Sequence, residues 1–136
     1  MMLPSEIQPA LQGVFPTMFG TCSLDGTPNM AVISQVFYVD PEHVAVSFQF
    51  FSKTHRNIRE NPFATAMILD PMSPMTWDLE LQYVRSETSG PTFDAMDMQL
   101  EAIASMSGMT GVFKLRAADI YKVLAVHKLT DEWQST

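Results

Sequence analysis

The chain has 136 residues, of which 46% are hydrophobic and 17% are charged, and its formal net charge is −7 at pH 7. This composition excludes a disordered chain and predicts one folded domain over residues 1–136. The acidic balance argues against general nucleic-acid binding, and no apolar run reaches the ~20 residues of a membrane span. Residues 1–13 lack the pattern of a secretory signal and Cys22 is the only cysteine, so we expect a cytoplasmic protein without an internal disulfide.

The first half of the chain predicts a short lead-in helix within residues 1–13 and then three strands. The expected elements are Pro4–Leu11, Thr17–Leu24, Asn29–Val39 and Val44–Phe50. Asp25-Gly26 is a strong signal for a tight turn between the first two strands. In the third strand, apolar residues alternate with small or polar ones, which predicts a half-buried strand with a polar second face.

The second half predicts two helices and four further strands. The expected elements are a helix over Thr54–Glu60, strands over Phe63–Leu69 and Trp77–Glu87, a helix from Gly90 to Met106, and strands over Val112–Leu115 and Ile120–Val126. Pro91 suits the first turn of the second helix. Short strands with few crossovers predict a mainly β fold with short helices, built as an antiparallel barrel. Residues 130–136 are expected to be a tail or a linker.

A cluster of positively charged residues follows the third predicted strand. Lys53, Arg56 and Arg59 fall within seven residues, although the whole chain has only eight lysines and arginines. Free N–H groups at a helix start, the hydroxyls of Ser52 and Thr54, and this charge would suit a phosphate. An ordinary capped helix with solvated basic residues explains the same spacing, and the spacing alone favours neither interpretation.

Polar residues also interrupt two of the predicted strands. Ser34 and Gln35 break the second strand, and Ser47 and Gln49 share one face of the third. Such residues could bond the rim of a flat heterocycle, although a solvent-facing strand side is the commoner origin of a lone serine or glutamine. The spacing of histidine and cysteine predicts no metal site.

Several of these segments together resemble a known family. The matching runs are Asp25–Asn29, Ile33–Val36, Ser47–Thr54, Asn57-Ile58 and Asn61-Pro62. They resemble the FMN-binding split-barrel proteins related to pyridoxamine 5'-phosphate oxidase, over residues 3 to about 129. The resemblance implies an antiparallel split β-barrel, a homodimer, and FMN bound between the two subunits.

The resemblance also implies specific contacts with FMN. Ser52, Lys53 and Thr54 would hold the phosphate, supported by Asn57. The ribityl chain and the ring would be lined by the backbone of Ile33, Ser34, Gln35 and Val36 and by Ser47, Phe48 and Gln49. The oxidases carry a phosphate-binding arginine where this chain has Ala31-Val32-Ile33, and they have a longer basic C-terminus. True pyridoxamine 5'-phosphate oxidase activity is therefore not expected.

Three functions follow from the resemblance, in order of preference. The first is an FMN-dependent oxidoreductase acting on an unknown small substrate. The second is a non-catalytic FMN-binding sensory or dimerisation module, such as the N-terminal region of a larger bacterial signalling protein. The third places haem or a deazaflavin in the same barrel. Haem is disfavoured by scattered histidines, and a deazaflavin by the acidic charge.

Overall fold

The computed structural model of the protein describes residues 2–12, 17–33, 36–48, 52–70, 75–106 and 115–128. Its strands are β1 (Thr17–Cys22), β2 (Pro28–Ile33), β3 (Val36–Asp40), β4 (His43–Phe48), β5 (Phe63–Leu69), β6 (Thr76–Glu87) and β7 (Ala117–Lys128). Its helices are η1 (Ser5–Gln12), α1 (Ser52–Glu60) and α2 (Pro91–Met106).

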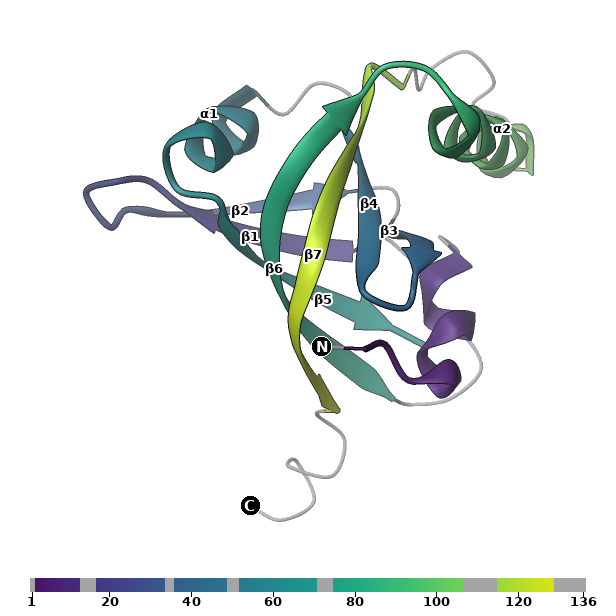
Figure 1. The fold of residues 1–136 in the computed structure, drawn as a ribbon, viewed down its shortest axis with the longest axis horizontal. Helices are drawn as coiled ribbons and strands as arrows, with labels where there is room; N and C mark the ends of the chain where they lie inside the picture. Colours follow the sequence, from purple (N-terminus) through teal and green to yellow (C-terminus); the bar gives the residue numbers. More distant parts are fainter. Residues whose placement is uncertain are drawn as a thin grey trace.

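The strands form one seven-stranded sheet in the order β2-β1-β5-β6-β7-β4-β3, and every neighbouring pair is antiparallel. The sheet curls into a barrel, in which β6 and β7 run side by side as long, curved strands (Figure 1). Helices α1 and α2 lie near the same end of the barrel, on opposite sides of β6 and β7 (Figure 1). The mainly β, antiparallel fold predicted from the sequence is confirmed.

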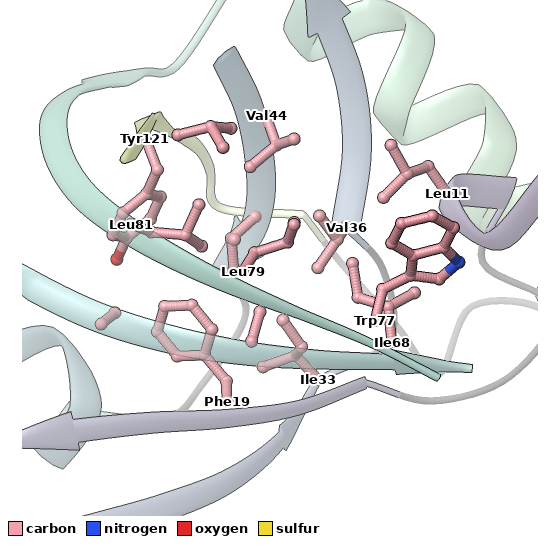
Figure 2. Close-up of a cluster of buried hydrophobic side chains, with 14 of the residues drawn as sticks. Leu11, Phe19, Ile33, Val36, Val44, Ile68, Trp77, Leu79, Leu81 and Tyr121 are labelled. Atoms are coloured by element: carbon pink, nitrogen blue, oxygen red, sulfur yellow. The ribbon is translucent and has the colours of Figure 1, made fainter. Parts of the chain in front are cut away.

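Alternating side chains of the strands fill the barrel interior. On β6, Trp77, Leu79 and Leu81 all point inward and are almost completely buried, as the predicted alternation requires (Figure 2). The ring of Tyr121 packs edge-on against Phe19, with a centroid distance of 5.5 Å. This interior core holds the strands in register and so fixes where their ends lie.

A second apolar cluster attaches α2 to the outside of the barrel. Met96 and Leu100 of α2 pack with Ala45 of β4 and with Ala118 and Ile120 of β7. The prediction of a half-buried β4 with an open polar face is therefore wrong, because α2 covers that face and buries the strand on both sides.

The bounds of several strands and the type of one helix differ from those predicted. The segment expected as one strand over Asn29–Val39 forms two strands, β2 and β3, at opposite edges of the sheet. The lead-in helix is a 3-10 helix with Pro9 inside it, where proline supplies no N–H to the helical hydrogen bonds. The last strand is longer than expected, and Leu115 precedes it outside any strand. No helix in the described ranges is long and apolar enough to cross a membrane.

Candidate functional site

Helix α1 carries the predicted anion-binding segment. It begins at Ser52 and ends at Glu60, one residue before Asn61-Pro62, as expected from the helix-breaking effect of proline on the residue before it. Lys53 lies in its first turn, and the first turn contains no acidic residue. Arg56 and Arg59 are exposed. The helix therefore presents N–H groups and net positive charge at its start.

The polar side chains of α1 that the structure describes face the β1–β2 hairpin. Asn29 Nδ2 on β2 donates a hydrogen bond of 2.9 Å to Thr54 Oγ1. Asn57 Nδ2 donates one of 3.2 Å to Thr21 Oγ1 on β1. Thr54 and Asn57 are only 3% and 4% exposed. These two residues attach the helix to the hairpin, and a contact of Thr54 with a phosphate stays a prediction.

A buried carboxylate lies on another side of α1. Asp119 on β7 is 3% exposed, and Ser86 Oγ donates a hydrogen bond of 2.6 Å to its Oδ1. The hydroxyl of Tyr83 lies 2.6 Å from the same Ser86 oxygen. Burial raises the pKa of Asp119, while the Ser86 hydrogen bond and the positive charges of His55 and Arg59 work in the opposite direction. Asp119 is thus a buried carboxylate near the start of β7 that is hydrogen-bonded to Ser86 of β6.

The other residues predicted to contact FMN fall into three groups. The side chains of Ile33 and Val36 belong to the interior core, so only their backbone could face a ligand. Ser47 is completely buried on the face of β4 that α2 covers, and its hydroxyl has no hydrogen-bond partner in the part of the chain that the structure describes. Six predicted contact residues lie wholly or partly outside the described residues: Ser34, Gln35 and Gln49 in full, and Phe48, Ser52 and Lys53 in their side chains.

An open groove of about 580 Å³ lies on the outer side of the barrel, next to the hairpin. It is lined by Gly20, Thr21, Cys22, Pro28, Asn29, Met30, Asn61, Phe63, Ala64, Thr65, Glu80 and Leu124. Gly20 lets the Met30 side chain approach closely, because a Cβ at this position would come within 3.1 Å of the Met30 sulfur. Thr21 and Asn29 line the groove and also bond to α1.

Large apolar side chains gather around this groove on the outside of the sheet. The register places Met18 directly opposite both Val32 of β2 and Met67 of β5, so the three side chains form a row across three strands. We define the outer apolar face as the exposed residues Met18, Met30, Val32, Phe63, Met67, Leu69 and Leu124. Exposed apolar surface of this extent is typical of an interaction site.

Sequence reasoning missed Thr21, Asn29 and Asp119. Each is a single polar residue in an otherwise ordinary strand, and each finds its partner 25 to 36 positions away in the chain. The one available signal was Asn29, which lies within a run that carries the family resemblance.

Comparison with known families agrees with the geometry. The family model described as Pyridoxamine 5'-phosphate oxidase matches residues 3–124. The chain belongs to this family. The resemblance seen in the sequence is thereby confirmed, and so is its split-barrel fold. Comparison with curated proteins finds no match to the sequence.

Solved structures with the same fold bind different ligands according to their names. An FMN-binding protein from Syntrophomonas wolfei subsp. wolfei aligns with a TM-score of 0.75 at 18% identity, covering 92% of this chain and 85% of that one. An F420 reductase aligns with a TM-score of 0.66 at 15% identity, over 92% and 98% of the two chains. HutZ, the haem storage protein from Vibrio cholerae, aligns with a TM-score of 0.55 at 17% identity, over 94% and 95%. The fold alone therefore leaves the choice of ligand to the residues of the site.

Proposed function

We propose that this protein binds FMN, with the phosphate at the start of α1, and acts as an FMN-dependent oxidoreductase on a small substrate. The observation that carries the proposal is the start of α1. In a chain with net charge −7, the first turn of this helix combines Lys53 with the backbone N–H groups of a helix start and no carboxylate. Lysine serves there as a point charge for a phosphate, and the hydroxyl of Ser52 is a further donor.

The residues present are compatible with a flavin. The groove volume lies within the roughly 300–1,000 Å³ of typical ligand pockets, and apolar walls with a few polar groups suit a flat ring. Bound FMN would supply the electron transfer, and the protein would bind and orient it and exclude water. The contacts implied by the resemblance for Ile33–Val36 and for Ser47, Phe48 and Gln49 also belong to this proposal, and they would extend the site beyond the residues that line the groove.

The proposal includes a homodimer assembled through the outer apolar face. Stable interfaces bury about 800 Å² on each partner and have a core depleted in charge, which agrees with seven large apolar side chains around one central row. We expect Met18→Glu to convert the dimer to a monomer, because it places a charge in the middle of that row. Light scattering after size-exclusion chromatography measures the change, and Met98→Glu on the exposed side of α2 is the control. A wild-type monomer would contradict this part of the proposal.

Lys53→Ala tests the phosphate site. We expect it to weaken FMN binding by about 1.5–3 kcal/mol, the range for a hydrogen bond to a charged group. Titration of FMN fluorescence measures the affinity, and the visible spectrum of the freshly purified protein reports whether flavin is already bound. Lys128→Ala is the matched control, since Lys128 ends β7 at the end of the barrel away from α1 (Figure 1). Equal affinity in Lys53→Ala and wild type would show that the phosphate lies elsewhere.

A second candidate is a non-catalytic FMN-binding module that senses or dimerises. It is favoured by Ala31, which stands on β2 where the oxidases of this family are expected to carry an arginine. The two candidates differ in electron transfer. If NADH or NADPH reduces the protein-bound FMN no faster than free FMN, and no small acceptor reoxidises it faster, the module is the better description.

A further inference from the structure

Four polar residues form a closed set between α1 and the β1–β2 hairpin. Thr21 and Asn29 are direct partners across the hairpin. Thr54 and Asn57 are three positions apart on α1 and therefore lie on one face of the helix. The Asn29–Thr54 bond of 2.9 Å and the Asn57–Thr21 bond of 3.2 Å connect the two pairs. We name this set the helix–hairpin clamp.

The clamp restrains the direction of the helix as well as its position. Apolar contacts tolerate sliding, whereas a hydrogen bond weakens steeply when its distance or angle changes. Two bonds at successive turns of α1 resist both translation and rotation. Breaking one would leave a polar group of a buried residue without a partner, and this costs more than the bond itself contributes.

The two helix residues of the clamp are poorly placed to contact a ligand themselves. Thr54 and Asn57 are buried, and both turn toward the hairpin. A phosphate at the helix start would instead meet the N–H groups of the first turn and the charge of Lys53. Those groups are useful only if the helix axis points at the ligand, since the helix dipole acts over the first turn.

We propose that Asn29 and Thr21 are positioning residues, which aim the start of α1 at the phosphate of the ligand through Thr54 and Asn57. This inference rests on the proposed FMN site and assigns a role to two strand residues outside the predicted contact set. It also reassigns Thr54 from a phosphate contact to a structural anchor. We therefore expect the clamp to favour the binding of FMN over riboflavin, because riboflavin lacks the phosphate at which the helix is aimed.

The experiment is a double-mutant cycle with Asn29→Ala and Thr54→Val, titrated with FMN and with riboflavin. We expect each single variant to bind FMN about fivefold more weakly, as for the loss of one hydrogen bond. The double variant should lose no more than about the same factor, because both changes remove one interaction. Riboflavin affinity should stay within about twofold in Thr54→Val, because Thr54 does not line the groove. Thr54→Ser keeps the acceptor oxygen and should restore FMN affinity.

The control is Thr27→Ala, which changes the exposed turn of the same hairpin without touching the clamp. Losses that multiply in the double variant would show that Thr54 contacts the phosphate directly and would overturn the inference. So would unchanged FMN affinity in Asn29→Ala, or equal losses for FMN and riboflavin in Thr54→Val. These results leave the proposed function standing. A wild-type protein that binds neither flavin would overturn the proposed function, and this inference with it.

Discussion

Helices α1 and α2 flank the same end of the barrel and are attached to it by opposite kinds of contact (Figure 1). Helix α2 lies on β4 and β7 through an apolar cluster that includes Met96 and Leu100. Helix α1 contributes Ile58 to the core, and two side-chain hydrogen bonds also join it to the hairpin. Apolar burial supplies stability without direction, whereas hydrogen bonds supply direction with little net stability. The comparison indicates that α2 mainly stabilises the fold, whereas the hydrogen bonds of α1 fix the direction of its helix axis.

The largest expected effect concerns α2. We expect Leu100→Ala to lower the free energy of unfolding by about 2–5 kcal/mol, because it removes a buried side chain and leaves a cavity. Urea unfolding measures the change, with the exposed Met98→Ala on the same helix as the control. FMN affinity of the folded variant should equal that of the wild type. A fall in affinity as large as the fall in stability would remove the distinction between the two helices.

A smaller effect is expected on α1. Asn57→Ala should lower the free energy of unfolding by about 1–3 kcal/mol, because the buried hydroxyl of Thr21 loses its donor. In contrast to Leu100→Ala, this variant should also weaken FMN binding, because the helix loses one of its two bonds to the hairpin. The same urea and fluorescence measurements apply. Unchanged FMN affinity together with lowered stability would make α1 a second purely structural helix.

The smallest effect is the pH dependence that Asp119 brings to the α1 side. Its folded pKa is raised, chiefly by burial, so its contribution to stability is complete below the unfolded pKa of about 3.9 and declines as pH rises through the folded value. Asp119→Asn should therefore gain stability relative to wild type as pH rises from below the unfolded pKa of about 3.9 through the folded value. Urea unfolding at several pH values measures the difference. A difference that shrinks over this range would mean that His55 and Arg59 outweigh burial.

The sequence predicted those features that depend on local patterns. Alternation placed Trp77, Leu79 and Leu81 inside the barrel, and Pro91 marked the start of α2. The split between β2 and β3 was not predicted, because the apolar run through Asn29–Val39 contains no glycine or proline to mark a boundary. The burial of Ser47 could not be predicted either, since it depends on α2, which lies more than forty positions later in the chain.

The same distinction between local patterns and long-range contacts applies to the candidate site. The cluster of basic residues around Lys53 can be recognised in the sequence because these residues are neighbours on one short helix. The partners that orient this helix, Thr21 and Asn29, are ordinary strand residues until the hairpin folds against it. Long-range pairs of single polar residues have no local signature, so only the fold reveals them.

The division between β2 and β3 has a further consequence for how the molecule avoids self-association by strand addition. These two strands are the edges of the sheet, and only two residues separate Ile33 from Val36. Three peptide units span at most about 11 Å, so the chain itself ties the two edges together at this point. Unpaired edges are templates on which strands of other molecules add and aggregate. Because neighbouring strands lie about 4.8 Å apart, the short join leaves room for at most one added strand between the two edges at this point, and an insertion between Ile33 and Val36 would remove that limit.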